Sequence, residues 1–327
     1  MAHTLMHRKK LSIVIPTYNG AEFLSDTLNS ILSQGMKNEI EVVVCDDLST
    51  DDTFDIARRF SKTYGHLKLY KNSLNLGMDK NFEKAVTYAT GEYFWFCGQD
   101  DVFEKGAIER VLSVVQMNND IDFIYVNYSQ NNHDLSKVIT DRVLHIDEDI
   151  LCKDPEAFLS TTDLKLPTFL PSFVLRRSLW DKVDKTPFYG TQYIQLGVLL
   201  TLLPNITTYI IAHPYVRGRI PDNGWQQSKI KLVDIFSGHL EVITYSHRII
   251  PTLITTSIYK KHFTFCWENI LQLICQLRLE GLNLNKKLTK RFKKIFKLQY
   301  IVIIKLCFFV PRKYTERLYK LAKRLGF

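Results

Sequence analysis

The chain has 327 residues, of which 46% are apolar, so it can bury a sizeable core in one large domain with an appendage or in two domains. Its six cysteines are scattered and form no CxxC pair, which argues against a disulfide framework or a zinc site and predicts buried thiols in a reducing compartment. The N-terminal segment MAHTLMHRKK has no apolar run, so we expect no secretory signal.

The positive charge is concentrated at the C-terminal end. The whole chain carries a net charge of +9, but residues 286–327 hold fourteen lysines and arginines and a single acid, Glu316. That segment therefore carries +13 and the rest of the chain carries −4. A mildly acidic body with a strongly basic tail predicts that the tail alone touches a polyanion or an anionic membrane surface.

Strands and helices are expected to alternate over the first half of the chain. Apolar runs of strand length lie at 11–16, 41–45, 67–70, 93–97 and 122–128, and helical patterning lies at 21–34, 49–60, 78–89 and near 104–118. Ser49 or Thr50 is placed to cap the second of these helices. Near-continuous apolar strands that alternate with helices predict an α/β fold with a mostly parallel sheet covered on both faces.

The second half of the chain is less regular. Prolines between positions 155 and 221 mark turns, and we expect mixed strands and short helices over 129–228. From about residue 229 the pattern is helical. The sequence therefore predicts two domains, residues 1–228 and a helical, basic region at residues 229–327.

Polar and acidic residues follow the first four predicted strands, at the point where each strand ends. They form the segments PTYNG (16–20), DDLSTDD (46–52), NSLNLG (72–77) and GQDD (98–101). In parallel sheets, ligands bind beyond the carboxyl ends of the strands. We therefore expect a site at this edge of the sheet.

Asp100 and Asp101 end the fourth strand and predict a site for Mg²⁺ or Mn²⁺. These ions take hard oxygen ligands, often one or two carboxylates with substrate phosphates completing the shell. Such a metal would neutralise a diphosphate leaving group. The alternative is that one aspartate caps a helix that starts near Glu104 while the other is solvated.

The other strand ends offer further contacts for a nucleotide. Asp46 or Asp47 is placed to accept from a base or a ribose, or to cap the following helix. Tyr18 could lie against a base or simply pack, and Lys80 could reach a phosphate or remain a solvated helix residue. Gly77 would let the backbone approach a ligand closely.

Four segments together resemble a known family. In order and spacing, PTYNG, VVVCDDLSTDDT, NLGMDKNFEKA and GEYFWFCGQDD are similar to the nucleotide-diphospho-sugar transferases of the GT-A type, glycosyltransferase family 2, over roughly residues 11–200. The resemblance implies a GT-A fold, a nucleotide-diphosphate sugar donor, and Mn²⁺ or Mg²⁺ on Asp101 and Asp100, with Asp101 the more direct ligand. It also implies that Thr17, Tyr18 and Asp47 contact the nucleoside and that Lys80 stands where the family often has arginine. With the other strand-end residues, the predicted donor site comprises Pro16, Thr17, Tyr18, Asn19, Asp46, Asp47, Gly77, Lys80, Asp100, Arg217 and Arg219.

The chain departs from the family where the general base is expected. The family carries a Glu-Asp pair at the start of a helix on the acceptor side, and this chain has Thr191 and Gln192 there. Neither side chain is a base at neutral pH. His213 and Asp222 are the alternative candidates, although an aspartate before Asn-Gly is also a common turn former. Arg217 and Arg219 could grip the diphosphate or close a loop.

The basic tail predicts contact with a membrane. Residues 299–310 are apolar but too short to span a bilayer, and they lie between two basic amphipathic segments of the kind that lie on anionic membranes. The alternative is a helical subdomain with solvated lysines. No sequence feature supports nucleic-acid binding.

These observations predict an enzyme that moves a sugar from a nucleotide donor to a lipid-linked glycan. The GTQY and RGRIPDN segments resemble the O-antigen abequosyltransferases, a resemblance that bears on the choice of donor sugar. Together with the basic tail, we expect synthesis of a bacterial surface polysaccharide at the inner face of the cytoplasmic membrane. An oxidoreductase is disfavoured because no GxGxxG follows the first strand. A non-catalytic scaffold that has lost its base is the remaining alternative.

Overall fold

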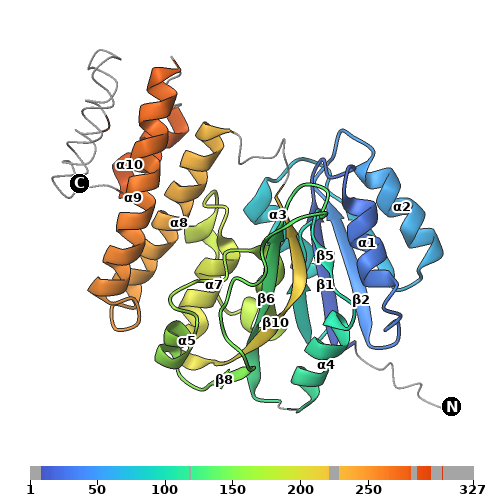
Figure 1. Ribbon diagram of the computed structural model, residues 1–327. Coiled ribbons are helices and arrows are strands. Elements are labelled where there is room, and N and C mark those ends of the chain that lie inside the picture. The colour runs from blue at the N-terminus through green and yellow to red at the C-terminus, as the bar shows by residue number, and fades with distance from the viewer. Residues whose placement is uncertain (1–8, 118, 221–227, 281–285, 296–303, 305–327) are drawn as a thin grey trace. The chain divides into compact units, whose positions relative to one another are not determined.

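A computed structural model describes residues 9–117, 119–220, 228–280, 286–295 and 304. Contacts divide the chain into two units (Figure 1). The first comprises residues 1–186 and 194–220, and the second comprises residues 187–193 and 221–327. The short segment 187–193 thus belongs to the helical unit, although it precedes the last helix and strand of the first unit.

The first unit is built on a ten-stranded mixed sheet. The strands on its main path lie in the order β3-β2-β1-β4-β9-β6-β10-β5, with β7 beside β6 and β8 beside β10. Their bounds are β1 Leu11–Thr17, β2 Ile40–Asp46, β3 Leu67–Lys71, β4 Tyr93–Phe96, β5 Val102–Phe103, β6 Ile121–Asn131, β7 Val138–Thr140, β8 Ile150–Cys152, β9 Phe173–Arg176 and β10 Thr207–Arg219. The five apolar runs at 11–16, 41–45, 67–70, 93–97 and 122–128 are confirmed as strands.

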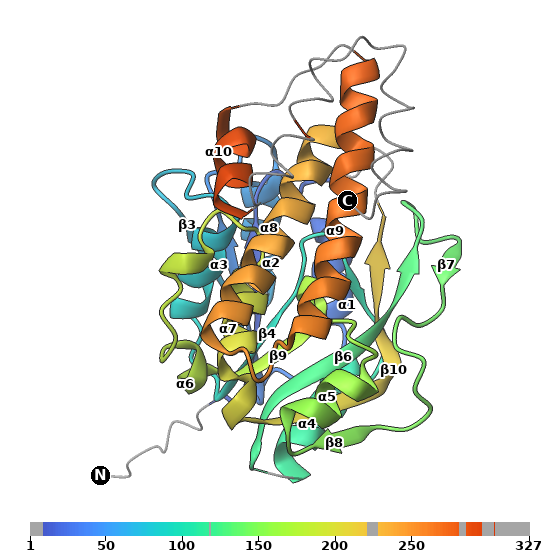
Figure 2. The ribbon, with the colours of Figure 1, turned by 90° about the vertical axis from the view of Figure 1, so that its left-hand side faces the viewer.

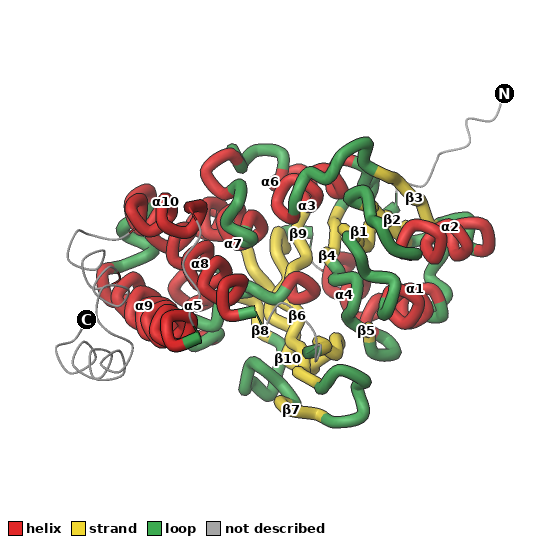
Figure 3. Tube along the Cα trace, turned by 90° about the horizontal axis from the view of Figure 1, so that it is seen from above, coloured by secondary structure: helices red, strands yellow, loops and turns green. Residues whose placement is uncertain are grey.

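Helices cover both faces of this sheet, as predicted. They are α1 (Leu24–Leu32), α2 (Thr53–Thr63), α3 (Met78–Thr87), α4 (Ala107–Met117), α5 (Pro155–Thr161), α6 (Arg177–Trp180) and α7 (Ile194–Leu202). Strands β1 to β4 are parallel, and connections between parallel strands of one sheet are almost always right-handed crossovers. Because β2 and β3 lie on one side of β1 and β4 on the other, α1 and α2 lie on one face and α3 on the opposite face (Figure 3).

Helix α2 does not begin where the sequence predicted. It starts at Thr53 after Asp52, so neither Ser49 nor Thr50 caps it. The Ser49 hydroxyl instead donates to Asp46 Oδ1 (2.5 Å), and Thr50 N donates to Asn19 Oδ1 (2.9 Å). These local polar residues hold two strand-end loops together, and so they are unavailable as a cap.

Aromatic side chains bury β4 on both faces. Phe94 and Trp95 are fully buried, and the Phe94 ring lies 5.4 Å from that of Trp180. On the other face Trp95 packs on Phe103 at 4.2 Å and donates from Nε1 to Pro171 O at 2.7 Å. Burial on both faces explains why this strand has no polar alternation. The residues just after β4 therefore follow a strand that is packed on both faces.

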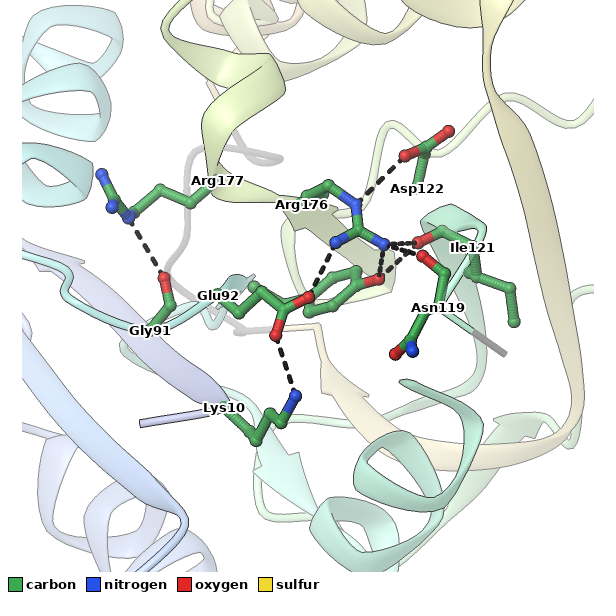
Figure 4. A network of polar contacts seen from close by, with 9 residues as sticks. Lys10, Gly91, Glu92, Asn119, Ile121, Asp122, Arg176 and Arg177 are labelled. Atoms are coloured by element: carbon green, nitrogen blue, oxygen red, sulfur yellow. Dashed lines mark hydrogen bonds and ion pairs between the residues drawn. The ribbon is translucent and has the colours of Figure 1, made fainter. Parts of the chain in front are cut away.

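An ion-pair network closes the opposite edge of the sheet (Figure 4). Arg176 of β9 contacts Glu92 Oε1 at 2.7 Å and Asp122 Oδ1 at 3.1 Å, and Lys10 contacts Glu92 Oε2 at 2.9 Å. Burial alone would raise the pKa of Glu92, but the hydrogen bonds from Lys10 and Arg176 outweigh it and lower that pKa. Since β9 is antiparallel to β4, this network lies away from the strand ends that carry the predicted site.

The second unit is helical (Figure 2). Its helices are α8 (Lys229–Ile249), α9 (Thr256–Leu279) and α10 (Lys286–Ile295), and the Ser228 hydroxyl caps α8 by accepting from Lys231 N. Its apolar core comprises Val233, Leu240, Cys266, Trp267, Ile270, Leu271, Ile274, Cys275, Leu277, Leu288, Phe292, Ile295 and Ile304. Within the described part of the chain, none of the helices combines the length and the apolarity that crossing a membrane requires.

Candidate donor and metal site

Asp100 and Asp101 fold back over the backbone at the end of β4. An ideal Cβ placed on Gly98 would lie 2.2 Å from Asp101 Oδ2 and 3.1 Å from Asp100 Oδ1. Both carboxylates therefore occupy the space that a side chain at position 98 would need. Helix α4 begins only at Ala107, so neither aspartate caps it. The alternative interpretation of this pair as a helix cap is wrong.

The electrostatics of this pair fit a divalent cation. Burial raises the pKa of Asp100, and burial together with the charge of Asp100 raises the pKa of Asp101 well above its usual range. A bound cation would relieve this penalty, and two carboxylates are a ligand set suited to Mg²⁺ or Mn²⁺. Among the described residues no group of three or more His, Cys, Asp or Glu side chains could hold a metal.

Arg219 holds this loop from the end of β10. Its side chain is 4% exposed, and its Nε donates to Asp100 O at 3.0 Å while its backbone N donates to Asp101 Oδ1 at 3.3 Å. The guanidinium also contacts Asp26 Oδ2 at 3.2 Å and lies 4.4 Å from the centre of the Phe23 ring. Arg219 therefore makes several contacts within the chain, and its predicted contact with a diphosphate stays a prediction.

Arg217 lies two residues earlier on the same strand. Its Nε is 2.8 Å from Glu104 Oε1, an ion pair that lacks the angle of a hydrogen bond, and its side chain is 37% exposed. The ion pair is therefore weak, and the side chain has donors left for another group. The predicted contact of Arg217 with a phosphate stays a prediction.

The ends of β1 and β4 are joined through Gln99. Its Oε1 accepts from Tyr18 N at 2.9 Å and its Nε2 donates to Tyr18 O at 3.1 Å. The Tyr18 side chain itself is 47% exposed, so its ring is open to a ligand. Asn19 follows with a positive φ of 50°, a conformation that asparagine tolerates, and Pro16 and Thr17 are buried in β1.

Two aspartates follow β2 and have different surroundings. Asp46 accepts from the Ser49 backbone and hydroxyl, within its own loop. Asp47 Oδ1 accepts from Asn72 Nδ2 and Leu76 N, each at 2.8 Å, and Asp47 Oδ2 accepts from Gly77 N at 2.9 Å. A carboxylate has about four acceptor positions, so Asp47 organises the loop after β3 and retains acceptor capacity at Oδ2.

Gly77 and Lys80 belong to the start of α3. Gly77 is the N-cap residue and has φ 79°, which favours glycine. Lys80 is exposed in the first turn of the helix. The structure thus brings the ends of β1, β2 and β4 together through hydrogen bonds, with the start of α3 joined to the end of β2.

An aromatic pair beside Asp101 was not predicted from the sequence. Tyr128 and Phe169 stack with their ring centroids 4.1 Å apart. Burial and the nearby charge of Asp101 raise the pKa of Tyr128, and a Cβ on Gly218 would lie 2.9 Å from the Phe169 ring. No local motif marks these residues, because strand β6, strand β10 and the loop before β9 come together only in the fold.

The candidate bases and the acceptor-side pair complete the predicted residues. His213 is exposed in β10 and its ring packs on Tyr215 at 4.5 Å, and Asp222 lies outside the described residues. Thr191 and Gln192 belong to the helical unit. There the Thr191 hydroxyl donates to Phe188 O at 2.7 Å, and Gln192 Nε2 donates to Asp234 Oδ2 at 2.9 Å. Their predicted role on the acceptor side stays a prediction.

Comparison with solved structures defines the class of fold. TarS residues 1–349 from S. aureus, solved in complex with UDP-GlcNAc, superimposes with a TM-score of 0.60 at 16% identity, covering 97% of this chain and 92% of that chain. The mannosyltransferase PcManGT from Pyrobaculum calidifontis, solved with GDP-Man and Mn²⁺, gives a TM-score of 0.54 at 16% identity, covering 98% and 87%. At this identity the likeness establishes the GT-A fold and no more.

The family follows from the sequence match. The model of glycosyl transferase family 2 matches residues 12–184, more than half of the chain. The chain therefore belongs to glycosyltransferase family 2.

Two bacterial glycosyltransferases are similar to the chain in sequence. The chain is 30% identical over 224 residues to abequosyltransferase RfbV of Salmonella typhimurium, covering 63% of this chain and 65% of that protein. It is 33% identical over 131 residues to UDP-Glc:alpha-D-GlcNAc-diphosphoundecaprenol beta-1,3-glucosyltransferase WfgD of Escherichia coli, covering 39% and 50%. The match thus spans less than two thirds of the length of each relative.

Proposed function

We propose that this chain transfers a sugar from a nucleoside-diphosphate donor to a lipid-linked glycan during synthesis of a bacterial surface polysaccharide. The observation that carries the proposal is the pair of carboxylates at the end of β4, the half-buried Asp100 and the buried Asp101, that fold over Gly98. Two neighbouring carboxylates, one of them buried, are unfavourable without a compensating positive charge. The pair is expected where a cation and a diphosphate complete the site.

The donor would lie across the strand ends. The open Tyr18 ring and the free acceptor position of Asp47 Oδ2 support a nucleoside between the ends of β1 and β2. Lys80 and Arg217 supply positive charge for the diphosphate. When bound by Asp100 and Asp101, Mn²⁺ or Mg²⁺ would neutralise the charge that develops on the leaving diphosphate. TarS and PcManGT, which share the fold, were solved with UDP-GlcNAc and with GDP-Man and Mn²⁺.

The relatives and the charge distribution support the proposed acceptor and its location. WfgD is named for a diphosphoundecaprenol acceptor, which is anchored in a membrane. The exposed Lys286, Lys290 and Lys293 of α10 are described parts of the basic tail. Lysines near an anionic surface contribute about 1 kcal/mol each. The proposal places the enzyme at the inner face of the cytoplasmic membrane, bound peripherally.

A thermal-shift screen tests this function. UDP-, GDP-, CDP- and dTDP-sugars are each added with Mn²⁺ or Mg²⁺, and nucleoside diphosphate release is measured for any that bind. We expect at least one nucleotide to stabilise the chain only when the metal is present. Stabilisation by none of them would contradict the proposed donor class.

A non-catalytic binding protein is the second candidate. Thr191 and Gln192 stand where the family has its acidic pair, and both are engaged in hydrogen bonds within the helical unit. A scaffold of this kind would bind the nucleotide and metal but release no nucleoside diphosphate from a sugar nucleotide. The same screen therefore separates the two functions.

A further inference from the structure

A buried aspartate lies in the first turn of α3, next to the predicted donor residue Lys80. Asp79 is 4% exposed and its Oδ1 accepts from Ile194 N, the first residue of α7, at 3.2 Å. Ile194 follows Gln192 by two residues, and Gln192 stands where the family has the aspartate of its acidic pair. The sequence thus has no carboxylate just before α7, and in the structure the Asp79 carboxylate of α3 lies at the first residue of that helix.

The packing of α3 places Asp79 near the strand ends. Phe82 of α3 contacts Phe96 at the end of β4, with ring centroids 5.6 Å apart. Asp79 precedes Phe82 by three residues and so lies on the same face, about 4.5 Å nearer the helix N-terminus. A helix that follows a parallel strand starts at the carboxyl edge of the sheet. Asp79 therefore lies beyond Phe96, toward the level of Gly98 and the carboxylates that fold over it.

A second polar group in the first turn of α7 has an unfilled acceptor. Gln195 is 2% exposed, its Nε2 donates to Thr168 O at 3.4 Å, and its Oε1 has no hydrogen-bond partner in the described structure. A buried acceptor without a donor is unfavourable. A hydroxyl group is the chemistry that would satisfy it. Thr168 adjoins Phe169, which stacks on Tyr128 beside Asp101.

Resting on the proposed function, we propose that Asp79 is the general base that replaces the missing acidic pair, with Gln195 orienting the acceptor hydroxyl. The hydroxyl oxygen forms a bond to the anomeric carbon of the donor sugar, and its proton passes to the Asp79 carboxylate. The bond from the anomeric carbon to the β-phosphate oxygen breaks, and its electron pair leaves with the nucleoside diphosphate. Asp79 then returns the proton to solvent.

The test separates a base from a helix cap, because Asp79→Asn keeps an oxygen that accepts from Ile194 N and removes only the basicity. Water serves as the acceptor, and release of nucleoside diphosphate is measured from UDP-glucose, GDP-mannose, CDP-glucose and dTDP-glucose with Mn²⁺. We expect Asp79→Asn to lower kcat by about 10² to 10⁴-fold. The melting temperature and the affinity for the nucleoside diphosphate with Mn²⁺ should stay at the wild-type values, and Asp79→Glu should recover part of the rate.

Two further variants keep the outcome interpretable. Asp55→Asn changes an exposed first-turn carboxylate on α2 and should leave the rate unchanged. Gln195→Met removes the unfilled acceptor at similar volume, and we expect kcat to fall about tenfold even if Asp79→Asn does not fold. Wild-type kcat in Asp79→Asn, or in Gln195→Met when Asp79→Asn does not fold, would overturn this inference and leave the proposed function intact. Nucleotide binding without any release by the wild-type chain would overturn both.

Discussion

Gly98 is the residue whose missing side chain makes room for the paired carboxylates. Because a Cβ there would lie 2.2 Å from Asp101 Oδ2, we predict that Gly98→Ala displaces Asp101 and abolishes metal-dependent nucleotide binding. Gly65→Ala is the matched control, since a Cβ at that position meets no atom within 4 Å. Calorimetric titration with UDP, GDP, CDP and dTDP in the presence of Mn²⁺ checks both variants. Unchanged binding by Gly98→Ala would argue that the carboxylates are not the metal site.

Asp47 could act on the donor directly or through the loop that it holds. We expect Asp47→Ala to raise the donor Kd much more than it lowers kcat at saturating donor, because a ground-state contact is lost. Asn72→Ala removes one of the loop contacts of Asp47 while keeping the carboxylate. A larger effect of Asp47→Ala than of Asn72→Ala would support direct contact with the nucleoside. Equal effects would assign Asp47 to the loop alone.

Some site residues were open to prediction from the sequence and others were not. Asp100 and Asp101 could be predicted as candidates because two carboxylates directly after a buried strand are unusual, and this pattern is visible in the sequence alone. Asp79 was missed, although it falls three residues before Phe82 on the apolar face of a helix, which is a detectable signal. The burial of Arg219 had no local signal, because it depends on Asp26 and Phe23, which lie nearly 200 residues earlier in the chain.

At the scale of elements, the α8–α9 pair carries a titratable contact inside its core. His239 Nε2 lies 3.2 Å from His262 Nδ1. Burial and the neighbouring His262 lower the pKa of His239 to about 3, and burial with the charge of Lys261 lowers the pKa of His262 to about 4. Both rings are therefore neutral in the folded helical unit at neutral pH.

This pair predicts acid lability of the helical unit. A base whose pKa is lowered by folding binds its proton more readily when unfolded, so stability is complete above the ordinary value near 6.5 and falls as the pH drops toward the folded values. The limiting loss is about 1.4 kcal/mol per pH unit for each histidine. Chemical denaturation between about pH 7.5 and pH 5 would measure it. The variant His239→Phe with His262→Leu should show a flatter dependence, and an equal slope would contradict the assignment.

The parallel strands were predictable as elements because their apolar runs are nearly continuous. The order and pairing of the antiparallel strands could not be predicted from the sequence. Strand β9 inserts between β4 and β6, and β10 runs from Thr207 to Arg219 with a register shift against β6 between Ile211 and Val216. Such pairings are decided by contacts between distant segments and leave little local pattern. The predicted start of α2 was wrong for a similar reason, because Thr50 N donates to Asn19, which lies in a different loop.

At the scale of the whole molecule, charge is separated between the body and the tail. In α10 the apolar residues Leu288, Phe292 and Ile295 are buried in the core of the helical unit, and Lys286, Lys290 and Lys293 are exposed. The apolar face of this helix is therefore covered. Any membrane contact that it makes would be electrostatic. Of the predicted apolar run at 299–310 only Ile304 is described, and it is buried in the same core. The predicted amphipathic segment at 311–327 lies outside the described residues.

This distribution makes substitution a better test than truncation. Truncation before residue 286 would remove Leu288 and Phe292 from the core and so destabilise the unit by several kcal/mol. We predict that Lys286→Gln, Lys290→Gln and Lys293→Gln together weaken binding to anionic liposomes by about 1 kcal/mol per lysine at low salt, without a change in melting temperature. High salt should mimic the variant. A full-length chain that ignores anionic liposomes at low salt would contradict membrane docking.

The central claim is that the end of β4 holds a divalent metal and, through it, a nucleotide. Calorimetric titration of wild-type and Asp101→Asn chains with UDP, GDP, CDP and dTDP, with and without Mn²⁺, tests it most directly. The account predicts that the wild-type chain binds at least one nucleotide only with Mn²⁺. It predicts that Asp101→Asn loses this binding with no loss of melting temperature, because a buried, poorly compensated carboxylate contributes nothing to the core. Metal-independent binding, or Mn²⁺-dependent binding that persists in Asp101→Asn, would contradict it.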